Sequence, residues 1–111
     1  MKLKPDKVLA MVGLAKRAGK VVSGEFSTEK AVKENKAQLV IVAADSSDNT
    51  RKMFSNMCEY YGVPLYFYSD KETLGHAIGT QFRASLAVTD QGFANTIIGH
   101  ISNHESVSPE K

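Results

Sequence analysis

Residues 13–25 read Gly-Leu-Ala-Lys-Arg-Ala-Gly-Lys-Val-Val-Ser-Gly-Glu and join three elements of secondary structure. A first helix is expected to end at Gly19, because glycine adopts the left-handed conformation after a last helical turn at little cost. Val21 and Val22 are β-branched and favour a short strand. Gly24 then opens a second helical pattern. The stretch therefore predicts a helix, a strand and a helix in direct succession.

Basic residues surround the two glycines of this stretch. Residues 1–36 carry nine Lys or Arg and four Asp or Glu, whereas residues 37–111 carry five and eight. A helix N-terminus with free backbone N–H groups, next to a basic helix end, is a natural anion site. We expect an RNA backbone there, and the alternative is a basic face that water alone covers.

Composition limits the kind of protein. A chain of 111 residues is expected to form one domain. Cys58 is the only cysteine, so no disulfide forms within the chain, which suits a reducing cytoplasm. Lysines interrupt the N-terminus where a signal peptide would be apolar. With no run of 18 apolar residues, the sequence predicts no contact with a membrane.

Strand and helix patterns alternate along the rest of the chain. Leu39-Val40-Ile41-Val42-Ala43 is a continuous apolar run of strand length, which predicts a central strand covered on both faces. The alternation predicts a single three-layer α/β/α sandwich on a four-stranded mixed sheet. The expected domain spans residues 1–104, and a polar tail follows at 105–111. Strands are expected at 21–23, 39–43, 65–68 and 86–89. Pro5 and Asp6 are expected to open the first helix, which runs to about residue 18. Further helices are expected at 26–35, 50–61, 70–78 and 90–104, with a loop at 79–85.

Helical spacing predicts which side chains are buried. Cys58 lies on an apolar stripe with Phe54 and Met57, which indicates a buried, unreactive thiol. Ala31 and Val32 should face inward from the second helix. The first helix should bury Val8, Met11, Val12, Ala15 and Ala18, and the tyrosines at 60, 66 and 68 are expected to pack in the core.

The sequence contains no convincing catalytic or metal-binding motif. Gly13 to Gly19-Lys20 has five intervening residues and ends a helix, whereas a phosphate-binding P-loop needs four and begins one. His100 and His104 are four residues apart, but no cysteine joins them as a further metal ligand. We therefore expect both to lie on an exposed helix face and to bind no metal. We therefore expect neither an enzyme nor a cofactor.

Several short motifs together resemble one known family. They are Lys30-Ala31-Val32, residues 39–45, Cys58-Glu59, Val63-Pro64, Lys71, Leu74-Gly75, Ala77 and Gly79. In combination they are similar to the kink-turn RNA-binding ribosomal proteins of the L-seven-Ae type, and especially to small bacterial members. The likeness covers about residues 5–101 and implies the sandwich fold described above.

The resemblance also implies an RNA-binding site. In the family, the N-terminus of the second helix enters the widened major groove of a kink-turn, and lysines hold phosphates. A loop before the last strand covers the flipped-out bulge nucleotide. Together with the basic helix end, these parts give the expected RNA-binding residues Lys16, Arg17, Lys20, Gly24, Glu25, Phe26, Ser27, Lys30, Phe82, Arg83, Ala84 and Ser85. The implied partners are kink-turn-like RNA, ribosomal or other, and the ribosome or translation factors; we expect a monomer.

The chain departs from the family at the residues that read bases. Strong kink-turn binders have Asn and Glu where this chain has Phe26 and Ser27, and Glu25 lies two residues too early to replace the glutamate. Phosphate anchoring should persist while base readout weakens. The alternative function is a protein–protein adaptor in a translation-related assembly, with the apolar loop at Phe82 meeting a protein. Steep salt dependence would favour RNA.

Overall fold

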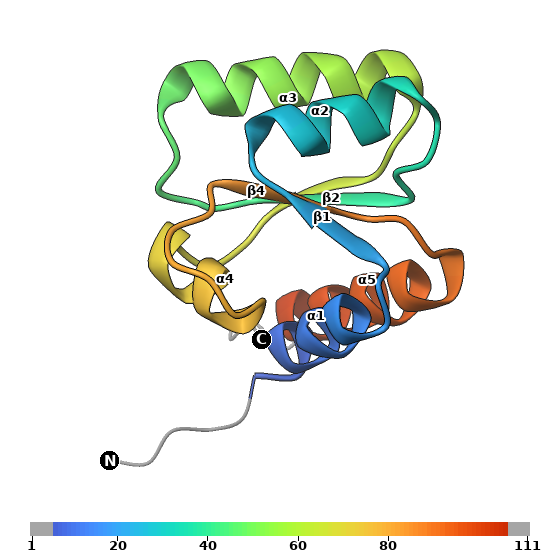
Figure 1. Ribbon diagram of the computed structural model, residues 1–111, viewed down its shortest axis with the longest axis vertical. Coiled ribbons are helices and arrows are strands. Elements are labelled where there is room, and N and C mark those ends of the chain that lie inside the picture. The colour runs from blue at the N-terminus through green and yellow to red at the C-terminus, as the bar shows by residue number, and fades with distance from the viewer. Residues whose placement is uncertain (1–5, 107–111) are drawn as a thin grey trace.

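The computed structural model describes residues 6–106, with side chains as far as residue 103. Helices and strands alternate as the sequence predicts (Figure 1). The elements are α1 (Lys7–Arg17), β1 (Val21–Ser23), α2 (Glu25–Lys33), β2 (Leu39–Val42), α3 (Asp48–Tyr61), β3 (Leu65–Phe67), α4 (Lys71–Ala77), β4 (Ser85–Val88) and α5 (Gln91–Ser106).

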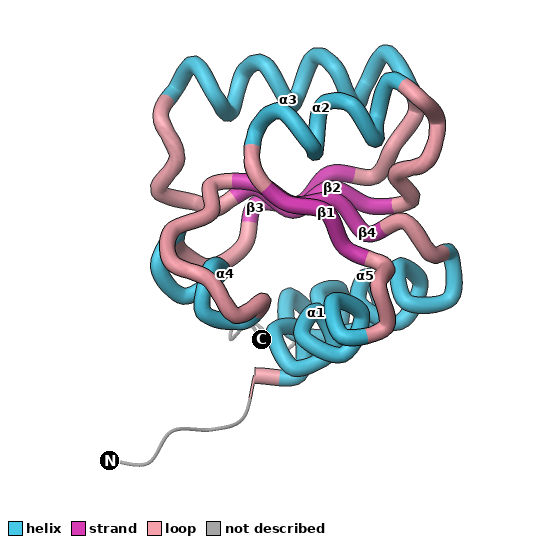
Figure 2. Tube along the Cα trace, viewed as in Figure 1, coloured by secondary structure: helices cyan, strands magenta, loops and turns pink. Residues whose placement is uncertain are grey.

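The four strands form one mixed sheet in the order β1-β4-β2-β3 (Figure 2). β4 pairs antiparallel with both β1 and β2, whereas β2 and β3 are parallel. β2 therefore lies inside the sheet, which confirms the expectation that the apolar run at 39–43 forms a central strand. β1 and β3 are the two edges.

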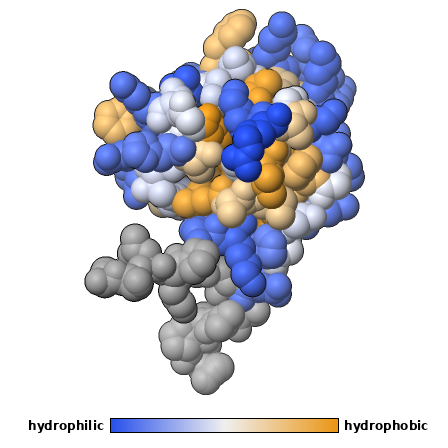
Figure 3. Space-filling view, turned by 60° about the horizontal axis from the view of Figure 1, so that its bottom comes forward, coloured by the Kyte–Doolittle hydropathy of each residue, from blue (hydrophilic) through white to orange (hydrophobic). Residues whose placement is uncertain are grey.

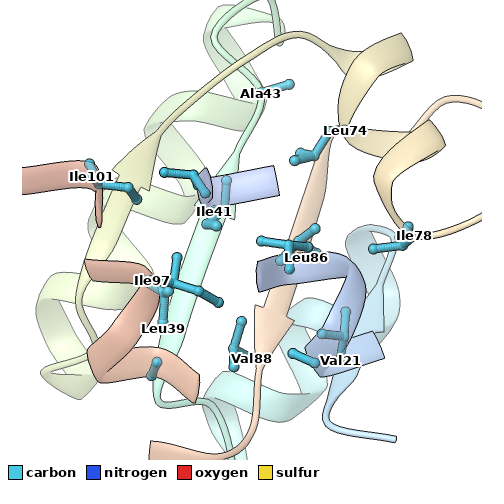
Figure 4. Close-up of a cluster of buried hydrophobic side chains, with 14 residues drawn as sticks. Val21, Leu39, Ile41, Ala43, Leu74, Ile78, Leu86, Val88, Ile97 and Ile101 are labelled. Atoms are coloured by element: carbon cyan, nitrogen blue, oxygen red, sulfur yellow. The ribbon is translucent and has the colours of Figure 1, made fainter. Parts of the chain in front are cut away.

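Helices cover both faces of the sheet, so the three-layer sandwich is confirmed. α2 and α3 lie on one face, and α1, α4 and α5 lie on the other (Figure 1). The period of two in β2 explains why the strand is apolar throughout. Leu39 and Ile41 pack in the cluster with α1, α4 and α5, as Figure 4 shows, while Val40 and Val42 pack in the cluster with α2 and α3.

Some apolar surface remains on the side of α1, α4 and α5. The face turned forward in Figure 3 shows apolar side chains bordered by hydrophilic ones. Half-buried hydrophobic residues packed against this cluster are Leu9, Met11, Tyr66, Tyr68, Phe93 and Ile98.

Short polar side chains set where the helices begin. The carboxylates of Asp6, Asp70 and Asp90 each accept a hydrogen bond from the backbone N–H three residues later, at 2.7–2.9 Å. At Asp70 this bond holds the pKa of the carboxyl below its usual value. The Ser47 hydroxyl caps α3 in the same way, which explains why α3 begins at Asp48 and not at Thr50 as expected.

Most burial expectations are confirmed, including those for Ala31, Val32 and Cys58, and two are wrong. Ala18 is exposed because it is the residue that ends α1, outside the packed turns. Tyr60 is 81% exposed, and its ring packs edge-on against Tyr61, with 4.9 Å between centroids, instead of entering the core. Cys58 is buried as expected, and burial raises the pKa of its thiol to about 11.

The expected bounds at the two ends of the domain can be compared with the structure only in part. α5 runs to Ser106, two residues beyond the expected domain boundary at His104. Pro5, expected in the first turn of α1, and residues 107–111 of the expected tail lie outside the described residues. Within residues 6–106, no helix combines the length and apolarity that a membrane crossing requires.

Candidate nucleic-acid interface

The start of α2 presents backbone N–H groups without a side-chain cap. Gly24 precedes the helix with φ 92° and ψ 158°, a conformation that suits glycine, and it makes no side-chain capping bond. Its own N–H donates to the carbonyl of Ser85 at 2.9 Å, which ties the helix start to β4. The next N–H groups have no acceptor within the helix, and they give this end a partial positive charge.

Phe26 lies on the outer face of this first turn. Thr28, Ala31 and Val32 are buried against the sheet, and Phe26 lies on the opposite side of α2 with 77% of its surface exposed. Lys30 follows one turn later on the same face. The first helical turn therefore presents an apolar ring with a cation beside it.

The loop 79–84, between α4 and β4, lies beside the start of α2. The Arg83 Nε donates to the Ser23 hydroxyl at 2.9 Å, and Arg83 Nη1 donates to the Phe82 carbonyl at 2.9 Å. These bonds leave other guanidinium N–H groups available to a ligand. Phe82 is 64% exposed. The Arg83–Ser23 bond joins residues that are sixty positions apart in the sequence.

Close packing on α4 fixes the path of this loop. A Cβ atom at Gly75 would lie 1.3 Å from the carbonyl oxygen of Gln81, so the loop backbone rests directly on the glycine. The N–H of Thr80 donates to the Gly75 carbonyl, and the N–H of Arg83 donates to the Lys71 carbonyl. Sequence reasoning did not assign Gly75 a role, although a glycine inside a helical pattern can signal such a close approach.

These contacts bring part of the expected site together. We call Phe26, Lys30, Phe82 and Arg83 the aromatic corner. Figure 1 shows the start of α2 and the loop that leads into β4 at the same end of the sheet. The other expected residues here differ in exposure: Glu25 is exposed, Ser27 and Ala84 are half-buried, and Gly24 lies between the two segments.

Ser85 is placed differently from the rest of the expected loop. It is the first residue of β4, only 1% exposed, and its hydroxyl faces that of Thr28 at 3.4 Å. Both hydroxyls lie under α2, where an unpaired polar group would be costly. The side chain of Ser85 thus holds α2 to the sheet and is not offered at the surface.

The basic end of α1 lies apart from the aromatic corner. Lys20 precedes β1 and Gly24 follows it, so roughly four residues of extended chain, about 13 Å, separate them. The basic end of α1 and the start of α2 thus lie at opposite ends of β1, and their contact with one RNA backbone stays a prediction. Lys16, Arg17 and Lys20 are all exposed, and none lies within ion-pair distance of a carboxylate in the described part of the chain.

Lysines on α2 differ in how firmly they are paired. Lys33 Nζ lies 2.8 Å from a Glu29 carboxylate oxygen, and this hydrogen bond raises the pKa of the lysine. Lys30 Nζ is 4.0 Å from Glu34, and both side chains are largely exposed. Exposed pairs of this kind contribute little to stability. Lys30 is therefore the α2 lysine most easily redirected to a phosphate.

Other chemistry finds little support in the same region. Among residues 6–106, no three His, Cys, Asp or Glu side chains come together to hold a metal ion. His100 lies on the half-buried side of α5, and the side chain of His104 lies outside the described residues. The surface is thus one of cations, aromatic rings and free N–H groups.

Comparison with known sequences gives a consistent result. Residues 6–98 match the family described as ribosomal protein L7Ae/L30e/S12e/Gadd45. A Bacillus subtilis (strain 168) protein named RNA-binding protein YlxQ is 46% identical over 88 residues, which cover 79% of this chain and 88% of that protein. A protein of the same name from Enterococcus faecium is 36% identical over 89 residues, covering 80% and 85%.

Solved structures show the same fold. A Bacillus halodurans C protein of unknown function superposes with a TM-score of 0.86 at 33% identity, over 88% of this chain and 99% of that one. The Giardia lamblia 15.5kD RNA binding protein superposes with a TM-score of 0.74 at 22% identity, over 97% and 96%. The second likeness concerns the fold alone.

Proposed function

The chain belongs to the ribosomal protein L7Ae/L30e/S12e/Gadd45 family, and from this membership we propose that it binds structured RNA and catalyses no reaction. Relatives that align with most of its length are named RNA-binding proteins. The exposed cations and the uncapped start of α2 suit the phosphates of RNA, and the exposed aromatic rings suit its flat, uncharged bases. The function proposed here is that of a ribonucleoprotein component acting in the cytoplasm.

One observation carries the proposal. The 2.9 Å bond from Arg83 Nε to the Ser23 hydroxyl fastens the loop 79–84 beside the start of α2. It fixes Arg83 and the exposed Phe82 next to it at Ser23. Ser23 lies just before α2, whose outer face carries the exposed Phe26 and Lys30. A rigid arrangement of this kind needs little ordering when RNA binds, which favours affinity.

The proposed target is a kink-turn-like motif in ribosomal or other RNA, bound through the start of α2. Backbone N–H groups there suit a phosphate and need no particular side chain. In this proposal Lys30 holds a neighbouring phosphate, and Lys20, at the other end of β1, contacts the RNA backbone. We propose that the chain binds this RNA as a monomer, and that the complex associates with the ribosome or with translation factors.

Binding of two fluorescently labelled RNA hairpins tests this function. One hairpin carries a kink-turn, and the other replaces its sheared G·A pairs with Watson–Crick pairs and lacks the bulge. We expect the kink-turn to bind more tightly, with an affinity that falls steeply as salt rises. If neither RNA bound at low salt, the proposed function would be wrong.

A second candidate function is a protein–protein adaptor. The observation that favours it is the exposure of Phe82, an apolar ring on a fixed loop. Association through such a ring depends mainly on buried apolar area and changes little with salt. The salt series above separates the two functions, because only RNA binding releases counterions.

A further inference from the structure

Among the exposed aromatic side chains of the described residues, Phe26 and Phe82 lack a partner for the ring, and Phe26 is the more exposed of the two. Phe67 is 40% exposed, but the Arg51 guanidinium lies over it, 5.2 Å from the ring centroid. Tyr60 packs against Tyr61. Across the described residues, no aromatic ring or cation packs on Phe26. Its ring is therefore free to receive a ligand.

Folding within the chain cannot cover this ring. Phe26 lies on the side of α2 opposite the buried Thr28, so any rotation that buried it would expose the helix's core face. A phenylalanine left 77% exposed forgoes a substantial hydrophobic gain. A single exposed apolar residue is common. What makes this one informative is the charge around it.

The surroundings of Phe26 select one kind of partner. Lys30 and Glu29 both lie one turn away from Phe26. Glu29 is paired with Lys33 at 2.8 Å, whereas Lys30 is only loosely held. Arg83, with unused N–H groups, lies at the same end of the sheet. An apolar protein surface docked here would leave these cations desolvated, which is costly. A nucleotide offers both a flat, uncharged ring and a phosphate, so it satisfies ring and cations together.

We propose that Phe26 is a stacking platform for one unpaired base of the bound RNA. The proposal rests on the RNA-binding function above and specifies its target. A base inside a duplex keeps its faces covered by neighbours, whereas an unpaired base can leave the stack and lie on an aromatic ring. The chain then selects RNA with an unpaired base next to the bound backbone.

This platform implies a different selectivity from hydrogen-bonded readout. A phenylalanine ring has no donor or acceptor for the edges of sheared G·A pairs. Every base has a π face, so stacking tolerates any base identity. We therefore expect the chain to discriminate RNA by where a base is unpaired and only weakly by which base it is.

The probe is an RNA hairpin with a three-nucleotide bulge between Watson–Crick stems, carrying 2-aminopurine at one bulged position. The same hairpin without the bulge is the control. Affinity and 2-aminopurine fluorescence are measured for the native chain, Phe26→Leu, Phe26→Tyr and the matched control Phe67→Leu. Leucine keeps the apolar bulk of Phe26 but removes the ring. Because Phe26 is exposed, thermal melting should confirm that its variants remain folded.

We expect the native chain to prefer the bulged hairpin and to quench its fluorescence. Phe26→Leu should weaken binding of the bulged hairpin roughly 5- to 100-fold and leave the closed hairpin unaffected. Phe26→Tyr and Phe67→Leu should behave as the native chain.

Equal binding of the bulged hairpin by the native chain and Phe26→Leu would overturn the platform while leaving RNA binding intact. Equal affinity of the native chain for both hairpins would also overturn the platform, because a ring that stacks on an unpaired base must favour the bulged hairpin. Absence of binding to either hairpin at low salt would instead remove the proposed function, and the platform with it.

Discussion

The aromatic corner and the α3–β3 side of the molecule both expose phenylalanine, yet they differ in what the rings contact. On the α3–β3 side, Arg51 lies over Phe67 and Tyr61 packs against Tyr60. At the aromatic corner, Phe26 and Phe82 have no such partner in the described chain, although Arg83 and Lys30 are nearby.

The difference shows that exposure alone is a poor guide to a binding surface. An aromatic ring already covered by a cation gains little from a ligand, because the ligand must first displace that cation. A ring without a partner gains the full contact. Arg83 is held by neutral groups, Ser23 and the Phe82 carbonyl, so its charge stays available to an anion. Lys30 has only a loose, exposed pairing with Glu34 at 4.0 Å.

Displacing the loop 79–84 should reduce RNA affinity more than any other change to the aromatic corner. In Gly75→Ala the new methyl group overlaps the Gln81 carbonyl, so the loop must shift away from α4. Overpacking of this kind costs about 1–3 kcal/mol of stability. We expect a lower melting temperature and a loss of RNA affinity that exceeds that of any single exposed-residue variant.

The matched control for this variant is Gly99→Ala, because a Cβ atom at Gly99 meets nothing within 4 Å. It should raise helix propensity in α5 and leave RNA binding unchanged. If Gly75→Ala bound RNA as tightly as the native chain, the loop would not belong to the binding surface.

Restoring the family's base-reading pair should produce the next largest change. Phe26→Asn combined with Ser27→Glu adds groups that hydrogen-bond guanine edges, and a good bidentate contact is worth roughly 1–3 kcal/mol, about one to two decades of affinity. Relative to Phe26→Leu, which also lacks the aromatic ring, the double variant should bind a standard kink-turn more tightly by that factor. Phe26 is exposed, so its replacement should not unfold α2.

The gain should disappear when Watson–Crick pairs replace the sheared G·A pairs. A folded double variant that bound the kink-turn no better than Phe26→Leu would show that residues 26 and 27 do not read bases.

Removing single cations should have a smaller effect. Lys30→Ala and Lys20→Ala are each expected to weaken binding for all RNA sequences and to lower the salt slope by about one unit. Lys30 lies in the aromatic corner and Lys20 at the far end of β1, so the pair measures how far the RNA extends along the molecule. Fluorescence titrations over a range of salt provide both slopes. A slope change for Lys30 alone would confine the RNA to the aromatic corner.

Arg51→Ala should have the smallest effect on RNA binding. It removes the cation over Phe67 and the hydrogen bond from Arg51 Nη1 to the Ala44 carbonyl, on the α3–β3 side. We expect unchanged affinity for the kink-turn hairpin and at most a small loss of stability, since both contacts are exposed. A loss of RNA affinity as large as that of Lys30→Ala would show that the two regions do not differ as described.

Sequence patterns predicted the elements because each depends on local chemistry. The run at 39–43, the caps at Asp70 and Asp90 and the helix end at Gly62 all act within a few residues. One misplaced boundary has a local cause, because the Ser47 cap starts α3 earlier. The other has a distant cause, because antiparallel pairing with Val42 of β2 draws Ser85 into β4.

The site was less predictable because its contacts are distant in sequence. Nothing in the sequence near Arg83 indicates that its partner is Ser23. The contact of the Gln81 carbonyl with Gly75 depends on how the loop 79–84 folds back onto α4. The separation of Lys20 from Gly24, in contrast, follows from the length of an extended strand and was predictable once β1 had been assigned.

Photocrosslinking compares the two regions in a single measurement. The native chain is irradiated in complex with a kink-turn hairpin carrying 4-thiouridine in its bulge, and crosslinked peptides are identified by mass spectrometry. If the aromatic corner binds RNA, crosslinks concentrate in peptides covering residues 24–30 and 79–84, and excess unlabelled hairpin abolishes them. Crosslinks concentrated in α3 and β3, with residues 24–30 and 79–84 free of them, would contradict the account.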